Sequence, residues 1–159
     1  MMLTEIQKRA LVFLAQTLER NEVDFQVTGG LAAIMYGAKR PLYDIDIDIC
    51  KKDVAKVREV FKEFIIVDWN NELEDDDVFD LWMMTLEIGG VSIDISQVEE
   101  GRVRVLGGEW VDLPQELEFE RMPFEGLGFP VQKKEALVAY KKVIARDTDL
   151  VDIQQITEN

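Results

Sequence analysis

VTGGLAAIMYGAKRPLYDIDIDI, residues Val27 to Ile49, is the stretch that decides the fold of this chain. A Gly-Gly step opens a short apolar segment, which leads into a run where Asp44, Asp46 and Asp48 alternate with isoleucines. Alternate residues of a strand point to the same face, so the three carboxylates would form a row with Cα atoms about 6.6 Å apart. Such like charges repel, and Mg²⁺, which prefers carboxylate oxygens and is often shared with substrate phosphates, would neutralise them. The pattern indicates nucleotide chemistry.

The bulk composition narrows the class of protein. With 159 residues, 47% of them hydrophobic, the chain is expected to form a single folded domain spanning residues 1–159. Its formal net charge of −14 would repel nucleic-acid backbones and anionic membranes, so neither is an expected partner. A small nucleotide that arrives with its own metal stays compatible, because the ion offsets the charge of both partners.

Missing residue types exclude several kinds of chemistry. The chain has no His, which removes Ser-His triads, His-bound zinc and a His general base. Its one cysteine, Cys50, allows neither an internal disulfide nor a thiolate metal cluster. Proton transfer must therefore use a carboxylate, Lys, Tyr or metal-bound water. The N-terminal residues lack the layout of a signal peptide, and no apolar run approaches the ~18 residues of a membrane span, so a cytoplasmic location is expected.

Hydrophobic periodicity predicts helices around a sheet, an α+β fold with a mixed, mostly antiparallel sheet. Gly89-Gly90 and Gly107-Gly108 are predicted hairpin turns, and the acidic run at residues 72–77 is predicted to be a solvated loop. Helices are predicted over residues 4–20, 30–36, 132–145 and 150–156, with a further one capped by Asp53, and strands over 25–28, 45–50, 79–88 and 91–98.

Three signals carry the candidate site. Gly29 and Gly30 stand at a predicted strand-to-helix turn, where backbone N–H groups can approach phosphate oxygens. The acidic strand follows, and Asp94 lies on the polar face of a later strand, flanked by Ile93 and Ile95. Taken singly, a Gly-Gly pair is more often a plain turn, and alternating acids are more often an exposed strand face. Their order and spacing together are specific.

In that order the motifs resemble the nucleotidyltransferase superfamily typified by DNA polymerase beta. Its pattern is a Gly-Gly or Gly-Ser step, two acids separated by one hydrophobic residue, and later one more acid between hydrophobics. The resemblance is nearest to small bacterial members: minimal nucleotidyltransferases, antibiotic nucleotidyltransferases and AbiEii-type toxins. In these an Arg often stands four residues before the first Asp, as Arg40 does, and a C-terminal helix resembles the segment containing Lys141. Two positions depart from the pattern. Leu42 stands where relatives often carry Ser or Thr, and Thr148 stands where many carry Lys.

The resemblance implies metal-dependent transfer of a nucleoside monophosphate from an NTP to an acceptor hydroxyl, with release of pyrophosphate. Asp44 and Asp46 would hold two Mg²⁺ ions, and Asp94 would join the metal nearer the acceptor and take the hydroxyl proton. The remaining implied site residues would hold the triphosphate, either through the loop and its hydroxyl or through positive charge: Thr28, Gly29, Gly30, Arg40 and Lys141.

Several alternatives stay open. Thirteen residues separate Gly30 from Asp44, a spacing that favours Asp44 and Asp46 as metal ligands, with Asp46 and Asp48 as the alternative pair. Arg40 and Lys141 could instead form surface ion pairs. A pairing of Arg146 with Asp149 or Asp152, which would fasten the last helix, would be structural.

A non-catalytic nucleotide-binding or toxin–antitoxin module of the same fold is the rival function. The acceptor could be a small molecule or a protein, and the small chain leaves room for a protein partner or a homodimer.

Overall fold

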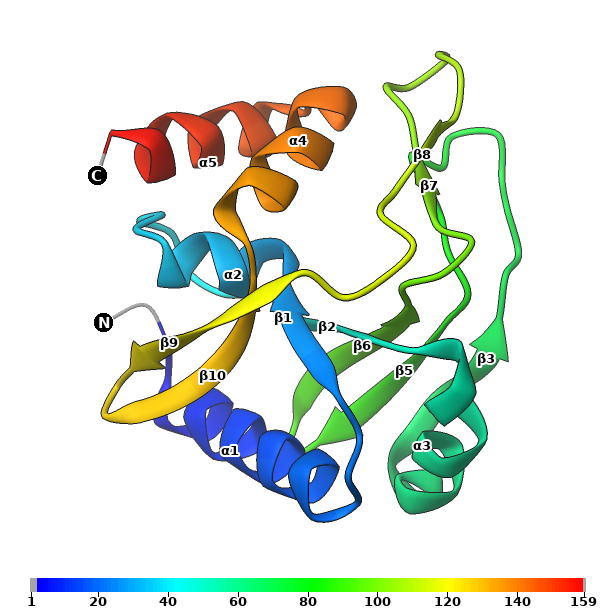
Figure 1. The fold of residues 1–159 in the computed structure, drawn as a ribbon, viewed down its shortest axis with the longest axis vertical. Coiled ribbons are helices and arrows are strands. Elements are labelled where there is room, and N and C mark those ends of the chain that lie inside the picture. The colour runs from blue at the N-terminus through cyan, green and yellow to red at the C-terminus, as the bar shows by residue number, and fades with distance from the viewer. Residues whose placement is uncertain (1–2, 159) are drawn as a thin grey trace.

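The computed structural model describes residues 3–158, and its centre is a seven-stranded sheet in the order β3-β5-β6-β2-β1-β10-β9 (Figure 1). The pairs β1/β10 and β2/β6 are parallel, and the other four pairs are antiparallel. The strands are β1 (Phe25–Thr28), β2 (Ile45–Ile49), β3 (Ile65–Asn70), β5 (Met83–Ile88), β6 (Val91–Gln97), β9 (Phe119–Phe124) and β10 (Leu127–Gln132).

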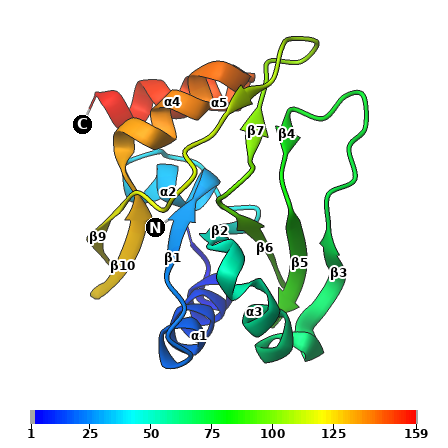
Figure 2. The ribbon, with the colours of Figure 1, turned by 45° about the vertical axis from the view of Figure 1, so that its right-hand side comes forward.

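A second, three-stranded sheet stands beside α4 and α5 in Figure 2, in the order β4-β7-β8. This sheet comprises β4 (Phe79–Asp80), β7 (Arg102–Val103) and β8 (Val111–Asp112). The α-helices of the molecule are α1 (Glu5–Arg20), α2 (Gly29–Met35), α3 (Val54–Val60), α4 (Lys134–Ile144) and α5 (Asp147–Thr157). The predicted α+β class with a mixed, mostly antiparallel sheet is confirmed.

The hydrophobic core lies on one face of β2 because isoleucine and aspartate alternate strictly along this strand. Its three isoleucines are fully buried and belong to the same hydrophobic cluster as the leucines of α1, which lies below the sheet in Figure 1. The first helix begins at a capping box: Gln7 N–H donates to the Thr4 hydroxyl at 3.1 Å, and Thr4 N–H donates to Gln7 Oε1 at 2.9 Å. The opposite face of β2 is thereby left to the aspartates.

Several predicted elements need correction. The segment 79–88 is not one strand, because Leu81 and Trp82 separate β4 in the small sheet from β5 in the large one. The helix predicted from residue 132 begins at Lys134, since Gln132 is the last residue of β10. Asp53 precedes α3 but makes no side-chain capping bond. The strands β3, β9 and β10 were not predicted at all.

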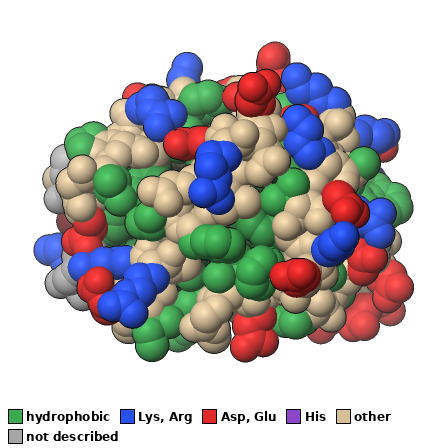
Figure 3. Space-filling view, turned by 90° about the horizontal axis from the view of Figure 1, so that it is seen from below, with side chains coloured by type: hydrophobic (Ala, Val, Ile, Leu, Met, Phe, Trp, Pro, Cys, Tyr) green, Lys and Arg blue, Asp and Glu red, His purple; other side chains and the backbone are tan. Residues whose placement is uncertain are grey.

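Charge on the surface is mixed. Seen from below, Figure 3 shows lysines, arginines and acids scattered between exposed apolar side chains, with acids gathered along one edge. This face carries no continuous basic surface of the kind that follows a nucleic-acid backbone. Among the described residues, no helix has the length and apolar character needed to cross a membrane.

Candidate active site

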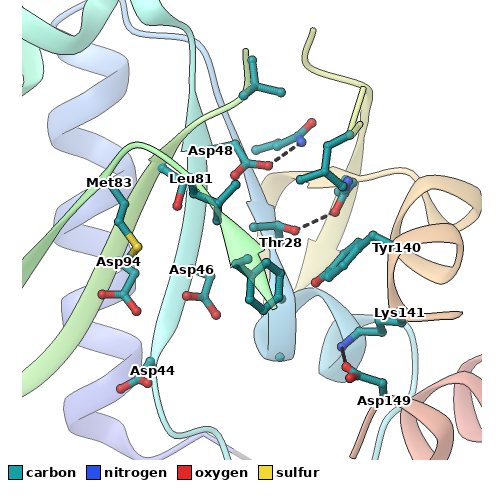
Figure 4. A pocket seen from close by; sticks show the side chains of 18 of the residues that line it. Thr28, Asp44, Asp46, Asp48, Leu81, Met83, Asp94, Tyr140, Lys141 and Asp149 are labelled. Carbon is teal, nitrogen blue, oxygen red and sulfur yellow. Dashed lines mark hydrogen bonds and ion pairs between the residues drawn. The ribbon is translucent and has the colours of Figure 1, made fainter. Parts of the chain in front are cut away.

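The acids of β2 and β6 lie side by side. In the sheet register Asp46 is opposite Thr28 on one side and Asp94 on the other, and Asp94 is opposite Thr85 of β5. One row of polar side chains therefore crosses four strands, and we call Thr28, Asp46, Asp94 and Thr85 the carboxylate row. Figure 4 shows Asp44, Asp46 and Asp94 on one side of the cavity, with Tyr140 and Lys141 facing them from α4. The two acidic strands, β2 and β6, are therefore direct neighbours in the sheet.

The carboxylates of this row destabilise one another. Burial, followed by the negative charges of Asp94, Asp44 and Asp48, raises the pKa of Asp46 to about 8. Burial also raises the pKa of Asp94, against the opposing effect of a hydrogen bond that Thr85 Oγ1 donates to Asp94 Oδ1 at 2.7 Å. The positive charge of Lys141 opposes the rise in the Asp46 pKa without cancelling it, which is the electrostatic setting that a divalent cation relieves.

The Gly29-Gly30 turn is packed directly against the acids. Gly29 has φ +61°, and a Cβ there would overlap the carboxylate of Asp46. At Gly30 a Cβ would lie 2.8 Å from Nη2 of Arg40, so the guanidinium rests on the backbone of the turn. Thr28 ends β1 just before the turn, and its hydroxyl donates to Gln132 Oε1 at 2.6 Å. A side chain at Gly29 would therefore force Asp46 to move, and a side chain at Gly30 would force Arg40 to move.

Arg40 and Lys141 belong to a buried ion-pair network. Arg40 donates from Nε and Nη2 to the two carboxylate oxygens of Asp152, at 2.9 and 3.0 Å. Lys141 Nζ lies 3.0 Å from Asp152 and 3.4 Å from Asp149, and its side chain is only 3% exposed. Arg146 Nε donates to Asp149 at 2.7 Å, which confirms its predicted pairing with the last helix. Arg40 and Lys141 thus do form ion pairs, but the pair of Lys141 is buried and that of Arg40 is partly buried, not at the open surface.

This network combines three cations with two carboxylates, so it keeps a positive surplus beside the Gly29-Gly30 turn. Burial acts to raise the pKa of Asp152, but the bonds from Arg40 and Lys141 prevail and hold that pKa below its ordinary value of 3.8. In a chain of net charge −14, a surplus of positive charge is the exception. It marks the side of the site suited to phosphate groups.

Asp48 lies one step farther along the same face of β2, away from Asp44 (Figure 4). Gln26 Nε2 donates to its Oδ2 at 2.8 Å. Burial raises the pKa of Asp48 to about 6, and the Gln26 bond opposes that rise. The hydrogen-bond partner of Asp48 is thus the side-chain amide of Gln26 on β1, while Asp46 lies near other carboxylates.

Apart from Thr85 and Asp152, the residues described above line one cavity of about 450 Å³. The predicted site residues that line it are Thr28, Gly29, Gly30, Arg40, Asp44, Asp46, Asp94 and Lys141. Within residues 3–158, no three carboxylates are drawn together into a complete metal cage. The donor set nevertheless fits Mg²⁺, because hard carboxylate oxygens converge from two strands and Mg²⁺ usually completes its shell with water and substrate phosphates.

Three further residues of the site were not predicted: Thr85, Gln132 and Gln26. Thr85 could have been found, because counting back from the two-residue Gly89-Gly90 hairpin places it opposite Asp94. Gln132 was assigned to a helix, and its neighbour strand β9 was missed. Pro123 and Pro130 interrupt both strands of that hairpin, and proline argues against a strand.

The fold and the site together define a nucleotidyltransferase. The profile of the aminoglycoside-2''-adenylyltransferase family matches residues 10–156, and the chain belongs to this family. No match was found among curated protein sequences.

Solved structures show the same fold. TM1012 from Thermotoga maritima, whose own assignment as a nucleotidyltransferase is provisional, is 23% identical with a TM-score of 0.66, covering 95% of this chain and 92% of that one. The lincosamide adenylyltransferase LnuA, bound to lincomycin, is 20% identical with a TM-score of 0.65, covering 98% and 97%. ANT(2'')-Ia with adenylyl-2''-tobramycin is 12% identical with a TM-score of 0.61, covering 95% and 88%.

Proposed function

We propose that this protein is a metal-dependent nucleotidyltransferase that moves the adenylyl group of ATP to a hydroxyl of a small-molecule acceptor and releases pyrophosphate. The observation that carries the proposal is the joining, in one cavity, of Asp46 and Asp94 with the Gly29-Gly30 turn and the cation-rich network around Lys141. Membership of an adenylyltransferase family supports the choice of nucleotide.

The chemistry is a displacement at the α-phosphorus. The acceptor oxygen forms a bond to that phosphorus, the bond from it to the α–β bridging oxygen breaks, and pyrophosphate leaves with the electron pair. The hydroxyl proton passes to the carboxylate of Asp94, which can fill this role in a chain without His. Asp44, Asp46 and Asp94 would hold two Mg²⁺ ions, which stabilise charge on the attacking and leaving oxygens when bound.

The other side of the cavity binds the leaving group in this proposal. Gly29 and Gly30 have no side chain of their own, so none projects from the turn itself toward the triphosphate. Arg40 lies on that turn, and Lys141 lies behind it in the buried network. Both cations reach their positions through Asp152, so this carboxylate orients the phosphate-binding charges.

Isothermal titration with α,β-methylene-ATP tests the site, because this analogue cannot be cleaved at the reacting bond. Binding is expected to require Mg²⁺ and to be lost in Asp46→Asn, while Asp76→Asn, which removes an exposed negative charge from the loop 71–78, keeps it. Equal binding without metal, or in the Asp46 variant, would contradict the proposal.

Turnover is then tested by mass spectrometry with ATP and hydroxylated antibiotics. The first acceptors to try are lincomycin, which is bound to LnuA, and tobramycin, whose adenylyl-2'' derivative is bound to ANT(2'')-Ia. A mass increase of one adenylyl group, with pyrophosphate in equal amount, is expected for an accepted compound. Metal-dependent nucleotide binding without transfer to any acceptor, protein hydroxyls included, would favour the non-catalytic binding module.

A further inference from the structure

Gln132, the last residue of β10, lies beside the Gly29-Gly30 turn. The parallel pairing of β1 with β10 sets Val27 opposite Val131, so the next residues along the two strands, Thr28 and Gln132, are neighbours. Gln132 is buried, with 6% of its surface exposed, and it lines the cavity. The carboxylate row therefore continues onto a fifth strand, β10, and ends there in a side-chain amide.

The side chain of Gln132 holds the residue that begins the turn. The Thr28 hydroxyl donates to Gln132 Oε1 at 2.6 Å, and this bond is the dashed line at Thr28 in Figure 4. Thr28 is also the N-cap residue of α2, where a threonine side chain usually accepts a hydrogen bond from the first turn of its own helix. Thr28 makes no such capping bond within residues 3–158. The orientation of its side chain is thus set by β10 and not by the helix that it begins.

The backbone of Gln132 holds the other end of the same helix. Tyr36 is the C-cap residue of α2, and its hydroxyl donates to the backbone carbonyl oxygen of Gln132 at 2.7 Å. One residue therefore bonds to the residues that flank both ends of α2, which lie 104 and 96 positions away in the chain. With only seven residues, α2 is too short to be stable alone in water, so its position depends on such outside contacts.

The turn that α2 carries has little room to move. An added Cβ at Gly29 would overlap the carboxylate of Asp46, and Gly30 lies against the guanidinium of Arg40. A shift of α2 toward either neighbour would displace that side chain, because groups packed this closely leave no slack. A shift away would separate the turn from the proposed metal and phosphate sites. The bond from Thr28 to Gln132 acts directly before Gly29, where it can fix this distance.

We propose that Gln132 is a positioning residue for nucleotide binding, which holds the Gly29-Gly30 turn at its distance from the carboxylate row through the hydrogen bond with Thr28. This inference rests on the proposed function and adds a residue outside the predicted site. Because Gln132 acts through Thr28, the two side chains make one shared contribution to nucleotide affinity and not two independent ones.

A double-mutant cycle in the titration with Mg²⁺ and α,β-methylene-ATP tests this role. Gln132→Met keeps the length of the side chain but removes the amide oxygen, and Thr28→Val removes the hydroxyl but keeps the shape. Each variant is expected to weaken nucleotide binding by about three- to tenfold, the effect of one hydrogen bond. The double variant should bind no more weakly than either single variant, because all three lose the same bond. Thr28→Ser, which restores the hydroxyl, should recover the wild-type affinity.

Thr17→Val is the matched control for the loss of a buried threonine hydroxyl. The Thr17 hydroxyl donates to the backbone carbonyl oxygen of Phe13 at 2.7 Å within α1, and Thr17 is not among the residues that line the cavity. This variant should leave nucleotide binding unchanged. A loss as large as that of Thr28→Val would show that removing any buried hydroxyl weakens binding, and it would overturn the inference.

Three further results would also overturn it: unchanged binding in Gln132→Met, losses of the single variants that add up in the double variant, and a loss in Thr28→Ser as large as that in Thr28→Val. Titration of wild type, performed first, separates the two proposals. Absence of metal-dependent nucleotide binding in wild type would overturn the proposed function and this inference together, whereas intact binding with any of the other results would overturn the role of Gln132 alone. Thermal melting shows whether each variant is folded. If Gln132→Met is not, Gln132→Asn, whose amide is one methylene shorter, takes its place in the cycle.

Discussion

Thr85 Oγ1 donates a 2.7 Å hydrogen bond to Oδ1 of Asp94 across the β5–β6 pair. The bond fixes one oxygen of the carboxylate that we propose as metal ligand and proton acceptor, and it opposes the rise of the Asp94 pKa caused by burial. Thr85 itself touches no reacting atom in this arrangement. It is a positioning residue for Asp94.

Replacing Thr85 by Val removes the hydroxyl and keeps the side-chain shape. We expect kcat for adenylyl transfer, or Mg²⁺ affinity in the nucleotide titration, to fall by about tenfold to a hundredfold, as is typical when a ligand loses its outer hydrogen bond. Thr85→Ser keeps the donor and should stay close to wild type. The prediction fails if Val and Ser variants are equally active, since the loss of one methyl would then matter as much as the loss of the hydrogen bond.

Gly29→Ala should abolish metal-dependent nucleotide binding. The new Cβ would overlap the carboxylate of Asp46, and the φ of +61° adds backbone strain of about 1 kcal/mol or more. Gly89→Ala is the matched control, because Gly89 has φ +57° but open space around the added Cβ. Both variants should lose stability in urea unfolding, but only Gly29→Ala should also lose nucleotide binding.

The sequence predicted the parts of the site that repeat with a short period. Strict alternation of Asp and Ile predicted β2 and its polar face. The order of the motifs along the chain predicted that Asp94 and the Gly29-Gly30 turn belong to the same site. These features are local, and a strand's period of two specifies which side chains share a face. Their neighbours across the sheet follow from pairing, which is not local.

The features of the site that the sequence did not predict depend on contacts between residues far apart in the chain. Gln132 contacts Thr28 from 104 positions away, and Asp152 meets Arg40 from 112 positions away. The sequence predicted Asp149 or Asp152 as partner of Arg146, but it did not show that both carboxylates are buried or that Asp152 pairs with Arg40 and Lys141. The partner of a charged side chain is set by packing of α4, α5 and α2, which only the folded chain shows.

Asp152→Asn should destabilise the protein mainly near neutral pH. The pKa of Asp152 is lower in the folded protein than its ordinary value of 3.8, so ionisation of Asp152 adds stability above that value. This contribution is lost as the pH falls through the folded pKa. Breaking a buried pair costs about 3–5 kcal/mol. Urea unfolding should show the full difference between wild type and variant at pH 7 and a shrinking difference below pH ~4; a difference independent of pH would contradict this.

The contribution of Asp46 to stability should change with pH in the direction opposite to that of Asp152. In the folded, metal-free protein its pKa is about 8, well above the ordinary 3.8, so the folded state holds a proton that the unfolded state releases between these values. Stability therefore falls as the pH rises through this window. Mg²⁺ binds the ionised carboxylates, so it should raise the Tm of wild type more at pH 8 than at pH 6.

The check is thermal unfolding with EDTA and with Mg²⁺ at both pH values. Asp46→Asn should flatten the fall in stability and lose the Mg²⁺ effect, because its amide neither titrates nor supplies a charged ligand. Asp76→Asn, which changes the net charge equally on an exposed loop, should behave as wild type. A Mg²⁺ effect of equal size in the Asp46 variant would place the cation elsewhere on this acidic protein and separate the carboxylate row from metal binding.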